Sequence, residues 1–272
     1  METDPILVFG KVLKALRERA GMSQKQLADI VNYSASFISA IENGTKPAKF
    51  SLVQRLDRAL NGGGALMAVW PITTVGTYPS WFARVAELER EAFKIHEWEV
   101  RVVPGLLQTA EYARAMMRAG RPTDDDDSIE RDVTARIDRQ EIFTSDSPPI
   151  AWFVIDESVL HRSIGGPHVM QQQLERLEQM SEMPTVVIQV MPSDIGSHPG
   201  IGGPLRILEF HDSPPIWYTE GWYSGRIVET PREVASAMTC FDLMKASALS
   251  PAESARAIAS IRSKQYEGTG LA

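Results

Sequence analysis

The chain has 272 residues, which corresponds to about two domains at roughly 150 residues per domain. Its formal net charge of −7 argues against a uniformly basic nucleic-acid binder, and its single cysteine excludes an internal disulfide framework and a multi-cysteine metal site. The N-terminus lacks the basic start of a signal peptide, and no run of about 18 apolar residues is present. We therefore expect a soluble, cytoplasmic protein without membrane association.

The charge is distributed unevenly around the glycine run at 62–64. Residues 1–63 carry nine basic and six acidic side chains, a net charge of +3, whereas the remaining residues carry 19 basic and 29 acidic ones, a net charge of −10. Three consecutive glycines interrupt a helix and supply a flexible joint. We predict a small basic domain over 6–61, a linker over 62–77 and a larger acidic domain over 78–266.

The basic domain reads as a string of short helices. Ser23 and Ser34 are predicted N-caps of the second and third helices, because a serine hydroxyl accepts hydrogen bonds from the free amides of a first turn. A tight turn around Asn32 joins these two helices, and the pair Asn43-Gly44 stops the second of them. This arrangement is typical of a helix-turn-helix, whose second helix enters the DNA major groove. A helical hairpin without DNA contact is the alternative.

The stretch from Lys11 to Leu60 resembles the Cro/C1-type, or xenobiotic-response-element-type, helix-turn-helix family. The similarity rests on S-Q-x-x-L-A from Ser23 and S-x-x-x-I-S-x-I-E-x-G from Ser34. The glycine that usually opens the turn is absent, and Asn32, which tolerates the left-handed conformation, lies nearby. By this resemblance, Arg17 and Glu42 form a structural ion pair.

The resemblance also implies which residues contact DNA. Ser34 would cap the recognition helix beside the DNA backbone, and the other expected contacts are Ala35, Ser36, Ser39 and Ala40 for bases, and Gln24, Lys25, Asn43, Lys46 and Lys49 for phosphates. Small side chains at the base-reading positions indicate modest direct readout, with reliance on DNA shape and phosphates. A weakly basic domain favours a homodimer on a two-fold double-stranded operator, with half-sites ~34 Å apart.

The larger domain is predicted to mix helices and strands. Residues 65–77 read as a loop or a short extended stretch. One long amphipathic helix is then predicted from the spacing of Trp81, Val85, Leu88, Ala92 and Ile95. The other predicted helices are 106–117, 128–143 (opened by acidic residues), 169–180, 231–247 and 251–264. The predicted strands are 150–155, 185–191, 205–210, 216–219 and 225–228. The fold class is therefore a mainly α helix-turn-helix domain followed by a larger α+β domain with one small sheet.

Candidate chemistry in the larger domain is sparse. Asp156 and Glu157 follow a strand and face His161 one helical turn on, which fits either an acid/base pair or an ordinary N-cap. An aromatic cluster could line a partner or ligand surface, or simply pack: Trp217, Tyr218, Trp222 and Tyr223. Cys240 is expected to be buried and inert, and the histidine spacing supports no metal, so neither a metal nor a cofactor is predicted.

Residues from about Trp81 to Ile261 resemble an uncharacterised actinobacterial domain found C-terminal to this kind of helix-turn-helix. The most specific matching element is V-P-G-L-L-Q-T-x-x-Y from Val103 to Tyr112, and further matches are Trp98, Arg136, Arg139-Gln140, Asp156 to Leu160, Gln173-Leu174, Val190 to Pro192 and Ala248 to Ser250. Such proteins resemble antitoxin-like transcriptional regulators, often encoded beside a small partner protein, and the resemblance implies no catalysis.

The sequence thus leads to the hypothesis of a sequence-specific transcriptional regulator, a repressor or an activator. Its larger domain would dimerise, bind a small cognate protein, or both. One alternative is a small-molecule-sensing repressor with its pocket at 217–223. The other is an enzyme with a DNA-targeting domain, which would use Asp156, Glu157 and His161.

Overall fold

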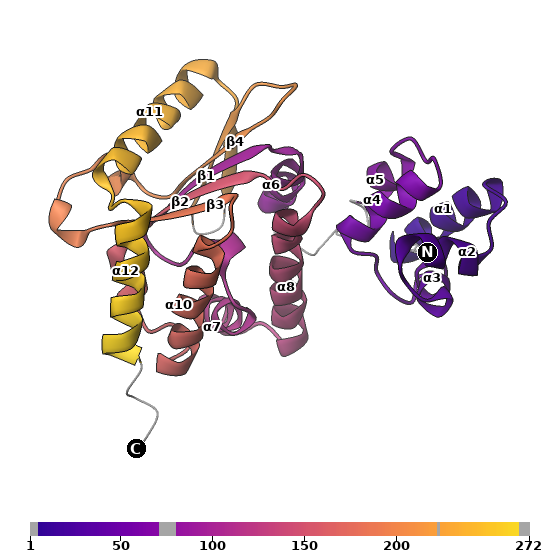
Figure 1. Ribbon diagram of the computed structural model, residues 1–272, viewed down its shortest axis with the longest axis horizontal. Helices are drawn as coiled ribbons and strands as arrows, with labels where there is room; N and C mark the ends of the chain where they lie inside the picture. The colour runs from indigo at the N-terminus through magenta and orange to yellow at the C-terminus, as the bar shows by residue number, and fades with distance from the viewer. Residues whose placement is uncertain (1–4, 71–79, 222–223, 267–272) are drawn as a thin grey trace. The chain divides into compact units, whose positions relative to one another are not determined.

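The computed structural model describes residues 5–70, 80–221 and 224–266. The chain divides into two compact units, Met1–Ala83 and Arg84–Ala272 (Figure 1). In the described part of the chain, no helix is both long enough and apolar enough to cross a membrane.

The N-terminal unit is a small helical domain with its own core. Its helices are α1 (Pro5–Arg19), α2 (Gln24–Val31), α3 (Ala35–Glu42), α4 (Phe50–Ala59) and α5 (Ala65–Val69). The helix pair buries an apolar face, which comprises Leu27 and Val31 on α2 and Ile38 and Ile41 on α3. These side chains join Leu13 of α1 in one apolar cluster, so burial of a shared core holds α2 and α3 together.

Helix α5 lies where the sequence predicted a loop. The glycines fold the chain back instead of only separating two domains, because Gly63 and Gly64 adopt positive φ angles of 63° and 87°. Asp57 of α4 then accepts hydrogen bonds from the amides of Gly64 at 2.7 Å and Leu66 at 2.9 Å. A carboxylate of the preceding helix therefore accepts the hydrogen bonds of the free amides at the start of α5. The composition of the sequence does not reveal this contact.

The C-terminal unit is built on one mixed sheet, as the predicted α+β class requires. Its strands are β1 (Lys94–Glu99), β2 (Ile150–Asp156), β3 (Val186–Met191), β4 (Leu205–Glu209), β5 (Ile216–Glu220) and β6 (Gly225–Val228). Their spatial order is β3-β2-β1-β4-β5-β6. The first three strands pair in parallel, and the pairs β1–β4, β4–β5 and β5–β6 are antiparallel.

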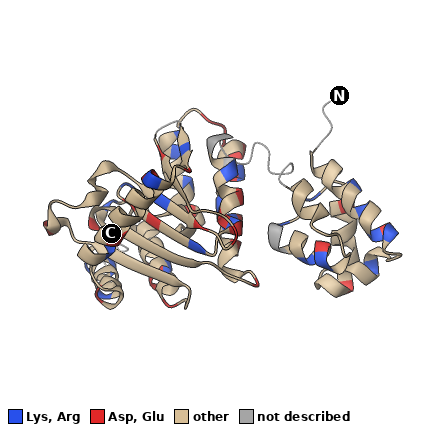
Figure 2. Cartoon of the chain, turned by 90° about the horizontal axis from the view of Figure 1, so that it is seen from above, with Lys and Arg blue, Asp and Glu red and all other residues tan. Residues whose placement is uncertain are grey.

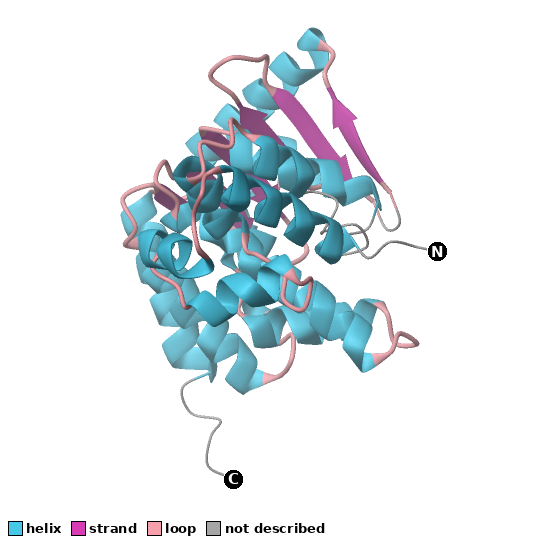
Figure 3. Ribbon diagram, turned by 90° about the vertical axis from the view of Figure 1, so that its right-hand side faces the viewer, coloured by secondary structure: helices cyan, strands magenta, loops and turns pink. Residues whose placement is uncertain are grey.

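Helices cover both faces of this sheet (Figures 1 and 3). They are α6 (Ser80–Glu91), α7 (Ala110–Gly120), α8 (Asp126–Arg139), α9 (Glu157–His161), α10 (Pro167–Ser181), α11 (Pro231–Ser247) and α12 (Pro251–Ile261). On one face, Phe153 packs in the large core with Leu174 of α10. On the other face, Trp98 and Val154 pack against Phe241 of α11. Because side chains alternate along a strand, each strand contributes to both layers.

The single long helix predicted through Ile95 is wrong. Helix α6 ends at Glu91, and β1 begins at Lys94. Strand β1 lies between β2 and β4, and both edges of its backbone are paired. Ile95 fits the helical period of the preceding residues but points from the strand into the core, since non-local strand pairing overrides local periodicity.

Candidate nucleic-acid interface

The ends of the two central helices are fixed by short local hydrogen bonds. Ser23 and Gln26 form a capping box, with Ser23 N donating to Gln26 Oε1 at 2.8 Å and Gln26 N donating to Ser23 Oγ at 3.2 Å. Asn32 ends α2 in the left-handed region at φ 56°, and Ser34 Oγ accepts the amide of Phe37 at 3.2 Å to start α3. The turn therefore follows from residues within it, with asparagine adopting the conformation that glycine usually supplies.

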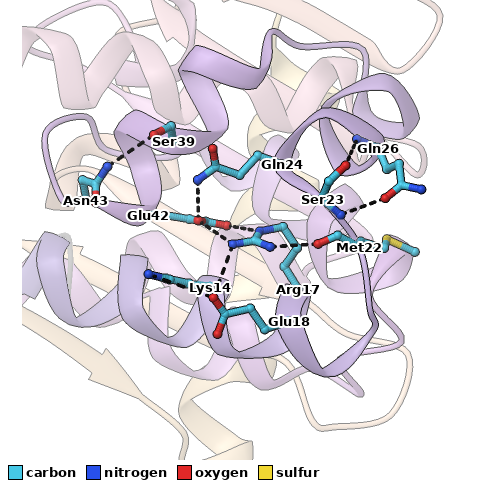
Figure 4. A network of polar contacts seen from close by, with 10 residues as sticks. All are labelled: Lys14, Arg17, Glu18, Met22, Ser23, Gln24, Gln26, Ser39, Glu42 and Asn43. Carbon is cyan, nitrogen blue, oxygen red and sulfur yellow. Dashed lines mark hydrogen bonds and ion pairs between the residues drawn. The ribbon is translucent and has the colours of Figure 1, made fainter.

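A buried ion pair connects the first and third helices (Figure 4). Arg17 Nε donates to Glu42 Oε1 at 2.5 Å, and its Nη2 donates to Glu42 Oε2 at 3.0 Å. Arg17 Nη1 also donates to the Met22 carbonyl at 2.8 Å, and the hydrogen bond to Glu42 holds the pKa of Arg17 above its usual range. Both residues are almost fully buried, so this pair supports the domain from within instead of facing a ligand.

Gln24, a predicted phosphate contact, belongs to the same network. Its Nε2 donates to Glu42 Oε2 at 2.8 Å, and the residue is half-buried. An amide nitrogen carries two hydrogens, so one remains to donate elsewhere while Glu42 fixes the orientation of the group. The network thus presents the start of α2 in one orientation.

The outer face of α3 carries only small side chains. Ser36 is exposed, with its Oγ 2.9 Å from Ser34 Oγ, and Ser39 and Ala40 are half-buried one turn on. Asn43 Nδ2 donates to Ser39 Oγ at 3.3 Å, while Ala35 is half-buried at the start of the helix. Hydroxyls and methyl groups of this size allow the helix backbone to approach base edges closely.

Exposed lysines flank the helix pair. Lys25 is exposed in the first turn of α2, Lys46 lies in the loop after α3, and Lys49 precedes α4. Figure 2 shows the Lys and Arg positions of this unit spread over several helices. Lysines at several helix ends match contacts to a phosphate backbone, which fix position without reading sequence.

The N-terminal unit also has a cluster of aromatic and cationic side chains that was not predicted from the sequence. Tyr33 and Phe37 stack with ring centroids 5.0 Å apart. Lys46 Nζ lies 5.6 Å from the Phe37 ring centre, and the Arg55 guanidinium lies 5.3 Å from that of Tyr33. The stacking orders two cations near the recognition helix. Phe37 lies four positions after Tyr33, and this spacing of two aromatic residues is the signal in the sequence that points to this contact.

In the C-terminal unit, the structure divides the predicted aromatic surface. Trp217 and Tyr218 are neighbours on β5, so they point to opposite faces of the sheet. Tyr218 is buried and donates its hydroxyl to Glu220 Oε2 at 2.9 Å, whereas Trp217 packs on the α11 side. Trp222 and Tyr223 lie outside the described residues.

The three residues of the predicted acid/base group make structural contacts. Asp156 caps α9 by accepting the amide of Ser158 at 2.9 Å. Glu157 Oε2 accepts the amide of Ser193 at 2.8 Å, and His161 Nδ1 lies 2.7 Å from Gln265 Oε1. Glu157 Oε1 and His161 Nε2 lie 3.9 Å apart, which is too far for a hydrogen bond. Each side chain thus holds a loop or a helix end.

The V-P-G-L-L-Q-T segment is held by buried side-chain amides. Gln108 Nε2 donates to the Val103 carbonyl at 2.7 Å, and its Oε1 accepts from Arg136 Nη1 at 2.9 Å. Gln173 of α10 is fully buried, accepting the Thr109 amide at 2.8 Å and donating to the Leu107 carbonyl at 2.8 Å. Apart from one 3₁₀ turn at Gly105–Leu107 the segment is irregular, and most of it is buried, so these side chains satisfy backbone groups that water cannot reach.

The C-terminal unit also contains a buried charge cluster that was not predicted from the sequence. Arg206 of β4 binds Glu89 of α6 at 2.7 Å and Glu97 of β1, and Arg139 lies 3.2 Å from Glu89. Burial would lower the pKa of Arg206, but the two carboxylates raise it above its ordinary value. The cluster ties strands to helices, and its signal in the sequence is the pair of acidic residues Glu97 and Glu99 on either side of Trp98 in KIHEWE.

Comparison with protein families gives two matches. A family described as a domain of unknown function (DUF5753) matches residues 82–260, and a helix-turn-helix domain matches residues 8–70. Neither the curated proteins nor the solved structures contain a match.

Proposed function

Because the chain belongs to the DUF5753 family and has a helix-turn-helix domain before that region, we propose that it is a sequence-specific DNA-binding transcriptional regulator of Cro/C1 type. The observation that carries the proposal is the outer face of α3, where Ser36 is exposed, together with the exposed Lys25 at the start of α2 and Lys46 in the loop after α3. A face of small polar and methyl groups flanked by cations fits a major groove.

In this proposal, α3 reads bases through short contacts. Ser36 and Ser39 donate to or accept from base edges, and the methyl groups of Ala35 and Ala40 contact thymine methyl groups. None of these four makes the bidentate contact of Arg, Asn or Gln, so part of the specificity comes from DNA shape and from phosphate contacts at Lys46 and Lys49.

The larger domain is proposed to supply the second function of an antitoxin-like repressor, namely dimerisation, binding of a small cognate protein, or both. The N-terminal unit has a net charge of only +3 and one eight-residue recognition helix. Two such units on a two-fold operator would add their contacts, with half-sites about 34 Å apart. The net charge of −10 on the rest of the chain would keep that part away from DNA and favour a basic protein partner.

The test is a gel shift of the full chain with fragments of its own genome. The assay is run at low salt, with and without the product of the neighbouring gene. We expect one or a few fragments to be retained, and double substitution of Gln24→Ala and Ser36→Ala to release them. Asp156→Ala, in the other unit, is the control and should retain the same fragments. Retention of no fragment, or equal retention by the double variant, would refute the proposal.

A further inference from the structure

A cavity of ≈ 530 Å³ lies on the α11 side of the sheet. The first part of its wall comes from β4 and β5, through Leu205, Trp217 and Thr219. The second comes from α11, through Ser236 and Cys240, and the third is the glycine-rich loop at 199–204. The volume falls within the range of small-molecule sites, about 300–1,000 Å³. Cys240 is thus not buried as expected, but half-buried, because its side of α11 borders this cavity.

The Trp217 indole distinguishes this cavity from ordinary packing. Three other tryptophans donate their indole N–H to an acceptor within the protein. Trp70 donates to Ala48 O at 2.8 Å, Trp98 to Gly200 O at 2.9 Å and Trp152 to Gln189 Oε1 at 2.7 Å. Trp217 Nε1 is buried and donates to no acceptor in the described part of the chain. A buried indole N–H nearly always has an acceptor, so Trp217, which lines the cavity, holds an unused donor that a turn of its ring would bring into the cavity.

The glycine-rich wall is preformed. Its inner end is fixed by the bond from Trp98 to Gly200, where an added Cβ would lie 2.6 Å from both Trp98 and Met244. Further along, an added Cβ at Gly202 or Gly203 would meet nothing within 4 Å. The loop is therefore anchored to the core at one end and borders open space at the other, so a ligand would enter without rearrangement of that anchor.

The formal charges of the lining sum to zero, which favours an uncharged ligand. Arg232 and Glu233 are adjacent in the first turn of α11 and oppose each other in sign, and Glu233 lies 3.8 Å from Arg226. The other polar groups of the wall are neutral, and the remaining surface is apolar. We propose that this cavity binds an uncharged, mainly apolar small molecule whose carbonyl or ether oxygen accepts the Trp217 N–H. The inference goes beyond the proposed DNA-binding function.

Nile red provides a probe of this chemistry, because it is uncharged, planar and fluorescent in apolar surroundings and carries a carbonyl acceptor. We expect the full chain to bind one dye with saturable, blue-shifted fluorescence. Cys240 is the only cysteine in the chain, so its alkylation by N-ethylmaleimide, followed by mass spectrometry, reports on this site alone. Saturating dye should slow that alkylation several-fold.

Two substitutions on one helix compare a lining position with its neighbour. Ser236 and Ala235 are both exposed, but only Ser236 borders the cavity. Ser236→Trp should therefore block the cavity and abolish dye binding, whereas Ala235→Trp should leave it unchanged. Trp217→Phe keeps an aromatic ring but removes the donor, and should weaken binding about tenfold, the equivalent of one hydrogen bond.

The proposal is overturned if the wild-type chain binds no dye, if Ser236→Trp binds it as well as Ala235→Trp does, or if the dye leaves the alkylation rate of Cys240 unchanged. Unaltered affinity in Trp217→Phe would refute the assigned hydrogen bond. The alkylation measurement uses the wild-type chain, so it remains decisive if a variant fails to fold. None of these measurements involves DNA, so their failure is distinguishable from failure of the proposed regulator function.

Discussion

Gln24 and Glu42 are joined by a hydrogen bond of 2.8 Å that connects the first residue of α2 to the last residue of α3. The same carboxylate binds Arg17, so one buried group positions all three helices around the candidate DNA-binding face (Figure 4). The geometry of that face therefore depends on a residue that does not itself belong to it.

Glu42→Gln is expected to destabilise the N-terminal unit by about 3 kcal/mol, because it leaves the buried Arg17 without a counter-charge. Hydrogen exchange of the α2 and α3 amides in the full chain measures this locally. Glu18→Gln is the matched control: Glu18 also faces Arg17, but at 3.8 Å and on the surface, so its loss should cost less than about 1 kcal/mol. Equal effects of the two variants would contradict a dominant buried pair.

Lys46→Gln is expected to lower operator affinity and to reduce the slope of log K against log[salt] by about 0.9 for each chain bound, since one phosphate contact is lost. Fluorescence anisotropy over a series of salt concentrations measures both quantities. Lys14→Gln removes an exposed lysine that lies 4.0 Å from Glu18 on α1, and should leave the slope unchanged. An unchanged slope in Lys46→Gln would remove Lys46 from the interface.

Gln173→Leu is expected to destabilise the C-terminal unit by about 3 kcal/mol, because the Thr109 amide and the Leu107 carbonyl would both remain buried without partners. Thermal unfolding followed by near-ultraviolet circular dichroism measures the change. Gln172→Leu, at the adjacent exposed position, should shift the midpoint very little. If the two variants melted alike, the amide clamp would have no part in holding the V-P-G-L-L-Q-T segment.

The contribution of Glu99 to the stability of the C-terminal unit is expected to fall as pH rises from 4.5 towards 7. Burial, and then the nearby Glu97 carboxylate, raise the pKa of Glu99 from 4.5 to about 7. In this window the folded chain holds a proton that the unfolded chain releases, so stability present below pH 4.5 is lost as pH approaches the folded pKa, by up to about 3 kcal/mol.

Urea unfolding at several pH values tests this, with Glu99→Gln as the comparison. The variant cannot titrate at this position and should show a flatter dependence than the wild-type chain. Parallel curves for the two proteins would show that Glu99 has the same pKa folded and unfolded.

The sequence reveals most about elements whose interactions are local. The capping box at Ser23, the cap at Ser34 and the left-handed turn at Asn32 depend on residues within a few positions of one another. Their patterns can therefore be read directly from the chain. The fold class, with its helix-turn-helix and its single sheet, follows from the same local signals and from the order of the predicted helices and strands along the chain.

Only the tertiary structure decides features that depend on distant partners. Strand β1 forms because β2 and β4 pair with both of its edges, and α5 begins where Asp57 of another helix satisfies its first amides. The alternation of β5 separates Trp217 from Tyr218, and only the packing of α11 over that strand leaves the Trp217 indole facing a cavity. Local patterns specify helices and turns by short-range hydrogen bonds, whereas strand partners, buried charges and cavities arise from residues far apart in the chain that meet only on folding.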